Sequence, residues 1–208
     1  MVQPAILSTA YLGPVQYYTK FLNHRVVIEK FETYLKQTYR NRCVIMTGNG
    51  PENLTIPVIR PFGNHTLVKD VQLDNSRKWQ LQHWRALIAA YNNTPFFEFY
   101  ADDFAPFYEH KYTYLLDFNE ELNRIVLENT GLDAPYSFSE SYQDLLKNDF
   151  RDSIHPKKSI EDPEFRPIEY HQVFGEKYGF VQNLSIVDLL FNCGPEALLV
   201  LKQSVQVH

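Results

Sequence analysis

The stretch EKFETYLKQTYRNR, residues 29–42, lies between two short apolar runs, VVI at residues 26–28 and CVIM at residues 43–46. We call residues 29–42 the central stretch. Runs of this kind, rich in β-branched residues, are typical of strands. The polar stretch between them is expected to form a connection on a rigid scaffold, where binding residues are often carried. These residues predict a β-rich beginning to the fold, with a candidate site beside it.

The same stretch holds the densest cationic cluster of a chain whose net charge is -5. Lys36, Arg40 and Arg42 lie within seven consecutive residues of it. The planar guanidinium of arginine can donate two parallel hydrogen bonds to a carboxylate or phosphate. Arg40 and Arg42 alternate as on a strand, so both could face one anion. The alternative is a solvated face of a short helix, in which Glu32 and Lys36 pair at i,i+4 spacing.

The spacing of apolar residues predicts a mixed α/β fold, one domain over residues 1–208, whose N-terminal β-rich part is packed by C-terminal helices. Strands are predicted at residues 5–11, 25–29, 43–47, 53–59, 67–73 and 169–174. Helices are predicted at residues 15–22, 79–92, 112–129 and, in two pieces, 185–201. Residues 43–47 and 53–59 are expected to pair as a hairpin, closed by the turn signal GNGP. Residues 96–107 are expected to form short helical turns, and 145–166 a long loop.

Composition narrows the class of function. A negative net charge argues against general nucleic-acid binding, which needs a basic face, and a local basic cluster favours a small anionic or sugar ligand, such as a nucleotide sugar. Cys43 and Cys193 lie far apart in apolar surroundings, which predicts two free thiols in a reducing compartment. No signal peptide or membrane-spanning run is recognised, so a cytoplasmic protein without membrane insertion is expected. The scattered histidines and the lack of a glycine-rich phosphate motif predict no metal and no cofactor.

His83 is the candidate catalytic residue. It lies beside the apolar stripe of the helix predicted at residues 79–92. As a general base it has a suitable ordinary pKa. The alternative is a histidine at the edge of the core, bonded to a carbonyl or a tyrosine.

Two further pairs of polar residues are binding candidates. Gln16 and Tyr17 stand at a helix start beside a strand end, where an anion can bind. Tyr170 and Gln172 alternate on a predicted strand and would present their polar tips together. Ser185 and Asp188, by contrast, have the spacing of a helix cap, which accounts for both without chemistry.

Three segments match the motifs of a known family. The first is STAYLGPVQYY at residues 8–18, the second comprises Tyr34, Lys36, Asn41 and Arg42, and the third is PIEYHQ with LSIVDLLFN, residues 167–172 and 184–192. In these segments, which span most of the chain, the sequence resembles the WbqC-like family, in its Bacteroidetes branch. The chain departs from the family pattern at Ser8-Thr9, where Gln-Pro is usual, and at Lys30-Phe31, where two aspartates are usual. A family segment that precedes the third motif, with a Gly-Gly and a Leu-Tyr pair, is missing.

The resemblance implies a role in the biosynthesis of a surface polysaccharide of the O-antigen type. The implied reaction is transfer of a small acyl or aminoacyl group, such as glycyl, to a sugar. In such a reaction His83, the candidate general base named above, would accept the proton of the attacking hydroxyl or amine. The residues expected to bind the ligand are Gln16, Tyr17, Tyr34, Lys36, Arg40, Asn41, Arg42, Tyr170 and Gln172. Of these, Lys36, Asn41 and Arg42 are expected to converge in the largest polar pocket with at least one of Tyr170 and Gln172. The alternative is a non-catalytic binding module that assists a partner complex in the same biosynthesis.

Overall fold

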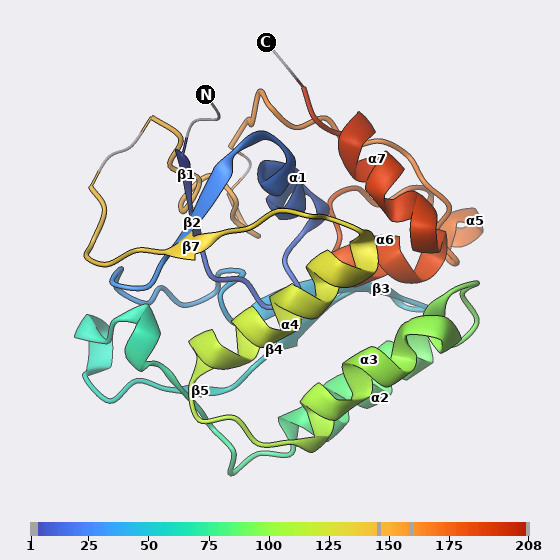
Figure 1. The fold of residues 1–208 in the computed structure, drawn as a ribbon. Helices are drawn as coiled ribbons and strands as arrows, with labels where there is room; N and C mark the ends of the chain where they lie inside the picture. Colours follow the sequence, from blue (N-terminus) through green and yellow to red (C-terminus); the bar gives the residue numbers. More distant parts are fainter. Residues whose placement is uncertain (1–3, 145–146, 159, 207–208) are drawn as a thin grey trace.

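A computed structural model describes residues 4–144, 147–158 and 160–206 and has a mixed α/β fold (Figure 1). Its central sheet is parallel. β1 (Pro4–Ser8) pairs with β2 (Arg25–Glu29), and β2 pairs with β7 (Ser137–Phe138). α1 (Val15–Asn23) connects β1 to β2, as a parallel pair requires. The strands and helix predicted over residues 5–29 are confirmed, with β1 ending earlier than expected, at Ser8.

The free edge of β1 is covered by residues 148–150. The amide of Ile6 donates to the Asn148 carbonyl, and the amide of Phe150 donates to the Ile6 carbonyl, each at 2.9 Å. These residues belong to the long loop predicted at 145–166, whose described part contains no helix or strand. The carboxyl end of β1 therefore lies between β2 on one side and this returning segment on the other. Ligands of open α/β sheets bind at such points.

The predicted hairpin is confirmed. β3 (Arg42–Thr47) and β4 (Gly50–Thr55) are antiparallel, with Thr47 opposite Gly50. Gly50 has φ of +104°, which glycine adopts without a steric penalty. This conformation lets the chain turn directly into β4, which begins at Gly50, earlier than expected. The strand predicted over 53–59 is interrupted at Ile56-Pro57, because proline cannot donate to a ladder. It resumes as β5 (Val58–Ile59), which pairs with β6 (Gln72–Leu73).

The region predicted as a strand over residues 67–73 is a strand only at its end, in β6, and contains a 3-10 turn before it, Val68–Asp70. A second 3-10 turn spans Gly63–His65. In the 3-10 turn before β6 the amide of Val68 donates to the Glu32 carbonyl at 2.9 Å. The segment therefore packs against the central stretch rather than extending a sheet.

Three helices form the largest layer, α2 (Trp79–Tyr91), α3 (Phe97–Glu109) and α4 (Leu115–Thr130), and α2 lies alongside α3 (Figure 1). The predictions of α2 and α4 are confirmed. α3 is one continuous helix, not the short turns expected. The rings of Phe97 and Phe104 pack on Phe191 with centroids 5.1 and 5.5 Å away. This tertiary packing stabilises the helix despite Pro106 within it.

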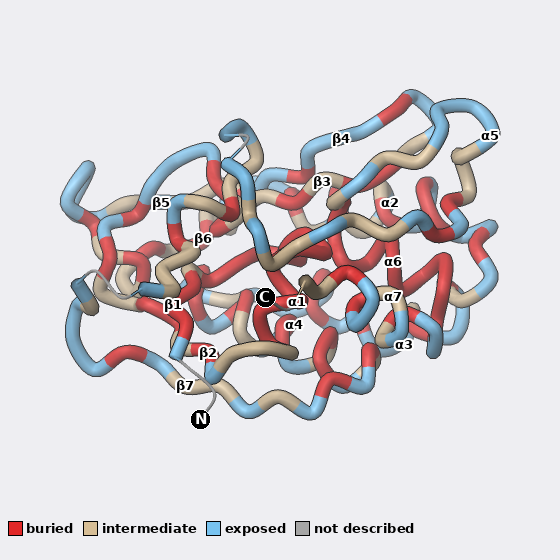
Figure 2. The backbone as a smooth tube through the Cα atoms, turned by 90° about the horizontal axis from the view of Figure 1, so that it is seen from above, coloured by how far each residue is buried: buried red, intermediate tan, exposed pale blue. Residues whose placement is uncertain are grey.

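The C-terminal part comprises α5 (Gly175–Tyr178), α6 (Ile186–Cys193), a 3-10 turn (Gly194–Glu196) and α7 (Ala197–Gln203). Every residue of α6 is buried, and Figure 2 shows buried backbone running through the middle of the molecule with exposed turns around it. Ser185 does not cap α6, because its Oγ donates to the Leu12 carbonyl at 2.7 Å. The strand predicted at 169–174 is irregular. None of the helices in the described residues has both the length and the apolar character needed to cross a bilayer.

Candidate functional site

An open cleft lies where the two longest parallel strands end. Its volume is about 430 Å³, within the usual range for small-molecule sites. We call it the strand-end cleft. It is lined by Phe31, Glu32, Thr33, Leu35, Arg40, Tyr142, Asp149, Arg151 and Asp152. The lining comes from the central stretch, which follows β2, and from the segment that covers the edge of β1, so distant parts of the chain build one site.

Arg40 forms one wall of the strand-end cleft. Its Nε donates to Glu32 Oε1 at 2.9 Å and its Nη2 to Glu32 Oε2 at 2.6 Å, and both side chains are buried. A two-pronged pair of this kind fixes the plane of the guanidinium group. The carbonyl of Arg40 also accepts a hydrogen bond from Asn119 Nδ2 at 2.8 Å, which ties the central stretch to α4. Arg40 is therefore held rigidly with its charge beside the cleft.

Arg151 forms the facing wall. Its Nε donates to Asp149 Oδ1 at 2.9 Å and its Nη2 to the Gln143 carbonyl at 3.0 Å. Hydrogen bonds to Asp149 raise the pKa of Arg151 above its already high ordinary value, so the group stays cationic. The guanidinium carbon lies 4.9 Å from the centroid of the Tyr142 ring, within the range of a cation–π contact. Nη1 comes no nearer than 3.8 Å to Glu29 Oε2.

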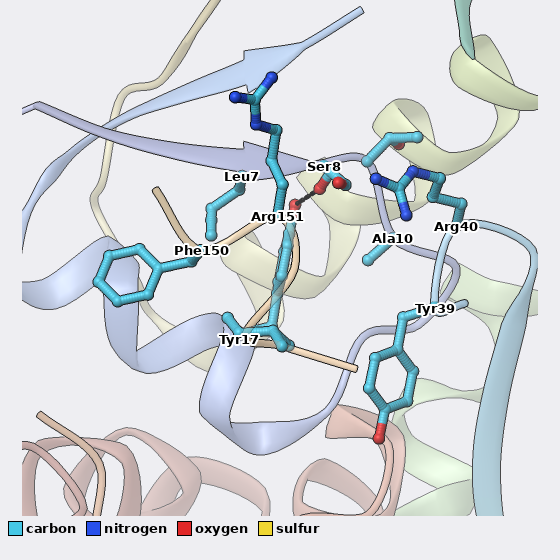
Figure 3. A pocket seen from close by; sticks show the side chains of 10 residues that line it. Leu7, Ser8, Ala10, Tyr17, Tyr39, Arg40, Phe150 and Arg151 are labelled. Atoms are coloured by element: carbon cyan, nitrogen blue, oxygen red, sulfur yellow. Dashed lines mark hydrogen bonds between the residues drawn. The ribbon is translucent and has the colours of Figure 1, made fainter. Parts of the chain in front are cut away.

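A second, much smaller cavity lies behind these two arginines, and we call it the inner pocket. Its volume is about 10 Å³. It is lined by Leu7, Ser8, Thr9, Ala10, Tyr17, Tyr39, Arg40, Phe150, Arg151 and Ile154. Figure 3 shows Ser8 between the side chains of Arg151 and Arg40, with the Tyr17 hydroxyl donating to the Ser8 carbonyl at 3.0 Å. The arginines thus face both cavities.

A hydroxyl–carboxylate pair adjoins the inner pocket. Thr9 Oγ1 donates to Glu120 Oε1 at 2.6 Å and accepts from Asn119 Nδ2 at 3.3 Å. The carboxyl group of Glu120 is buried, and this desolvation raises its pKa to about 7, although the hydrogen bond from Thr9 acts to lower it. A carboxyl group with that pKa can accept or donate a proton near neutral pH. Thr9 and Glu120 therefore have the geometry of an acid–base pair.

The residues of the second family motif do not converge. Lys36 is exposed. Asn41 is buried and its Nδ2 donates to the Ile56 carbonyl at 2.7 Å, which fastens the start of β3 to the chain after β4. Arg42 Nε donates to Thr55 Oγ1 at 3.2 Å on the hairpin. Tyr34 is buried, and burial raises its pKa to about 12.

The other binding candidates line separate cavities. Tyr17 is in the inner pocket. Gln16 lines a polar cleft of about 560 Å³ and its Nε2 donates to Asp162 Oδ2 at 2.8 Å. Tyr170 and Gln172 do meet, on a buried carboxylate: the Tyr170 hydroxyl donates to Asp188 Oδ2 at 2.7 Å and Gln172 Nε2 to the same oxygen at 3.0 Å. Their polar tips are therefore occupied within the protein.

His83 lies in the core, with 6% of its surface exposed. Its Nδ1 is 2.9 Å from the Tyr11 hydroxyl, and its ring packs against Tyr11 and Trp79. Burial lowers the pKa of His83 to about 4, so the ring is neutral at pH 7 and a weak base. These contacts match the alternative of a histidine bonded to a tyrosine.

Sequence reasoning did not single out Thr9, Glu120 or Arg151 as site residues. Arg151 lies in a segment that resembles a plain polar loop, and only its pairing with residues of the sheet edge buries it. Glu120 is an ordinary acidic residue of an amphipathic helix, and the feature that matters is the burial of its carboxyl group. Thr9 offered one signal, because Ser8-Thr9 stands where the family has Gln-Pro.

Comparison with known proteins agrees with the family motifs. The model of the WbqC-like protein family matches residues 10–155 and 157–200. An uncharacterized protein of Mycobacterium tuberculosis is 25% identical over 227 residues, which cover 95% of this chain and 96% of the relative. No solved structure matches the chain. Because the family model covers nearly the whole sequence, the chain belongs to the WbqC-like protein family.

Proposed function

We propose that the protein is a transferase of surface-polysaccharide biosynthesis, which moves a small acyl or aminoacyl group, such as glycyl, onto a sugar bound in the strand-end cleft. The observation that carries the proposal is that two fixed arginines line the inner pocket together with Thr9, whose hydroxyl is hydrogen-bonded to a buried carboxyl group of raised pKa, that of Glu120. The setting in polysaccharide biosynthesis is supported by the family resemblance.

The arginines supply binding. Each uses two nitrogen atoms to hold a carboxylate of the protein, which leaves its remaining N–H groups for a ligand. Because Arg40 and Arg151 come from opposite walls, an anionic group between them would be held from two directions. A preorganised pair loses little side-chain entropy when the ligand arrives.

Thr9 and Glu120 supply proton transfer. The hydroxyl or amine of the acceptor must lose a proton as it attacks the acyl carbon of a thioester donor. The carbon–sulfur bond of the donor then breaks, and the thiolate leaves and takes up a proton from the solvent. Glu120 is about half ionised at pH 7, given a pKa of about 7. It can take the proton of the acceptor through the Thr9 hydroxyl, which is already hydrogen-bonded to it at 2.6 Å. Glu120 replaces His83 in this proposal because its carboxyl group is hydrogen-bonded to Thr9, which lines the inner pocket, and because its pKa suits the task better.

Calorimetric titration with nucleotide sugars and sugar phosphates tests the binding half. Arg151→Ala should weaken binding by about 1.5–3 kcal/mol, the size of a hydrogen bond to a charged group. Arg77→Ala is the matched control, since Arg77 is an exposed arginine on another part of the surface, with its side chain 74% exposed. Equal affinities of the two variants would remove the strand-end cleft as the site.

A transfer assay separates the enzyme from the binding module. The wild type and Glu120→Gln are incubated with a glycyl thioester and the sugar that binds most tightly, and the product is followed by mass spectrometry. The amide keeps the shape of Glu120 and an acceptor for the Thr9 hydroxyl but cannot take up the proton. Product from the wild type and little from Glu120→Gln, at unchanged sugar affinity, is expected. Tight binding without product from the wild type would favour the non-catalytic module.

A further inference from the structure

Two hydrogen-bond donors at the inner pocket have no hydrogen-bond partner within the described part of the chain. They are Ser8 Oγ and Arg151 Nη1, and both atoms are buried. The nearest anion to Nη1 is Glu29 Oε2, whose 3.8 Å distance is too long for a hydrogen bond. Burying a donor without an acceptor is costly, particularly for a charged group. Two such donors that line the same cavity point to an acceptor oxygen that the protein does not itself provide.

The direction of Arg151 Nη1 is fixed by the rest of its side chain. Its Nε and Nη2 are held by Asp149, and Nη2 also donates to the Gln143 carbonyl. The side chain is only 9% exposed, so it is packed as well as hydrogen-bonded. Glu29, the nearest carboxylate, is itself occupied, since it accepts hydrogen bonds from Ser139 Oγ and from the amides of Phe31 and Gln143. Nη1 is therefore a fixed donor on a residue that lines the inner pocket.

The size of the inner pocket limits what it can take. A volume of about 10 Å³ is that of a single oxygen-sized group. A carboxylate is planar and can place one oxygen there while its other oxygen remains on the outer side of the arginines. A phosphate could place one oxygen there as well, but it carries up to two negative charges. The strand-end cleft is lined by the carboxylates of Glu32, Asp149 and Asp152 as well as by the two arginines, so a carboxylate with one negative charge is repelled less than a phosphate.

The strand-end cleft in front of the arginines is much larger, about 430 Å³, and it offers aromatic as well as polar surface. The Tyr142 ring lies under the Arg151 guanidinium and the Phe31 ring is another part of the lining. A cleft with apolar ring faces and a few fixed polar groups is suited to a sugar ring. A carboxylate attached to that ring could reach the arginines from the cleft.

We infer that the sugar bound in the strand-end cleft is an acidic one, a uronate, whose carboxylate bridges Arg40 and Arg151 and places one oxygen against Ser8 Oγ and Arg151 Nη1. The inference rests on the proposed function only in taking the strand-end cleft as the ligand site. It adds the substrate class, which the family motifs do not specify. The carboxylate is a recognition group in this arrangement and takes no part in the transfer.

The test compares matched sugars by calorimetry. Glucuronate and galacturonate are titrated beside glucose, galactose and glucose 1-phosphate. The wild type should bind a uronate at least roughly tenfold more tightly than the corresponding neutral sugar, as two hydrogen bonds to a charged group imply. It should also prefer the uronate to glucose 1-phosphate. A uronate that binds no more tightly than its neutral counterpart would overturn the inference.

Ser8→Ala locates the effect. It should weaken uronate binding roughly tenfold and leave the binding of neutral sugars unchanged. Ser153→Ala is the matched control, because Ser153 Oγ is likewise buried without a hydrogen-bond partner but lines other clefts. Equal uronate affinities of the two variants, with melting temperatures close to that of the wild type, would contradict the carboxylate subsite.

The outcomes keep the two proposals apart. If glucose 1-phosphate binds, if Arg151→Ala weakens that binding, and if uronates gain nothing over neutral sugars, the strand-end cleft remains a ligand site and the acidic-sugar inference is wrong. If uronates bind tightly but neither Ser8→Ala nor Arg151→Ala alters their affinity, they bind elsewhere, and both proposals fail.

Discussion

Charged groups are buried both around Asp188 and at the strand-end cleft. The two places differ in how many of their buried polar atoms have hydrogen-bond partners within the protein. Each oxygen of Asp188 has protein donors, since Oδ1 accepts from the Tyr91 hydroxyl at 2.9 Å and Oδ2 from Tyr170 and Gln172. At the inner pocket behind the cleft, Ser8 Oγ and Arg151 Nη1 are left without such partners. A buried network with every member paired contributes to a unique fold, whereas unpaired members mark a place for a ligand. The C-terminal family motif thus builds the scaffold.

The largest expected effect is on stability, from Asp188→Ala. Loss of the carboxylate leaves the hydroxyl groups of Tyr91 and Tyr170 without an acceptor and removes one of the two hydrogen bonds donated by Gln172 Nε2, so the free energy of unfolding should fall by about 3–5 kcal/mol. Urea unfolding followed by circular dichroism measures it. Asp188→Asn, which keeps the shape and an acceptor oxygen, should lose less. A loss below about 1 kcal/mol for Asp188→Ala would mean that the network is not the anchor of α6.

The acid–base pair should have a pH signature of its own. Burial raises the pKa of Glu120 from 4.5 in the unfolded chain to about 7 in the folded protein. The folded state therefore binds the proton more strongly. This effect costs stability above pH 7, and the cost disappears as the pH falls toward 4.5. The full difference is roughly 3 kcal/mol, at about 1.4 kcal/mol for each pKa unit.

The measurement compares the pH dependence of the unfolding free energy of the wild type with that of Glu120→Gln. The wild type should gain stability relative to the variant as the pH is lowered from 7.5 to about 5. Parallel curves would show that Glu120 has an ordinary pKa, and the proton-transfer role of Thr9 and Glu120 would lose its support. The same comparison of pH dependence, made for a variant of Asp149, gives a second reference, because Asp149 is a carboxylate that lines the strand-end cleft.

The smallest effects on stability and binding are expected for two residues of the second family motif, although the sequence predicted large effects on binding there. Lys36→Ala and Arg42→Ala should each change stability by less than about 0.5 kcal/mol, since Lys36 is exposed and Arg42 bonds only to the Thr55 hydroxyl. Each should weaken sugar-phosphate binding less than Arg151→Ala does, in the same calorimetric titration. If Arg42→Ala weakens binding as much as Arg151→Ala, the site extends along β3, and the motif residues are part of it.

Local patterns predicted the parts of the fold that depend on near neighbours. The β-branched runs at residues 26–28 and 43–46 became strands, the glycine-rich turn became a hairpin, and the 3.6-residue pattern at 79–92 became α2. The predictions of secondary structure failed where contacts between residues far apart in the sequence decide the conformation. Residues 97–109 form one helix because their rings pack on α6, and residues 169–174 are irregular because Tyr170 and Gln172 bond to Asp188.

For the candidate site, the sequence located one wall and missed the other. The cationic stretch after β2 contains Arg40, and its position beside the strands was readable from the chain. Which of its cations matters was not readable, since Arg40 differs from Arg42 only in having Glu32 within reach in the folded protein. Arg151 comes from more than a hundred residues away and reaches the site through the pairing of Phe150 with Ile6.

The sequence by itself determined the family, the alternation of strands and helices and the presence of a basic cluster in an acidic chain, because those properties reside in residue type and spacing. Only the tertiary structure decided which groups are charged, unpaired or able to move a proton. A pKa near 7 for Glu120 and two unpaired donors at the inner pocket arise from burial. Burial is set by the whole packed chain, and no local segment encodes it.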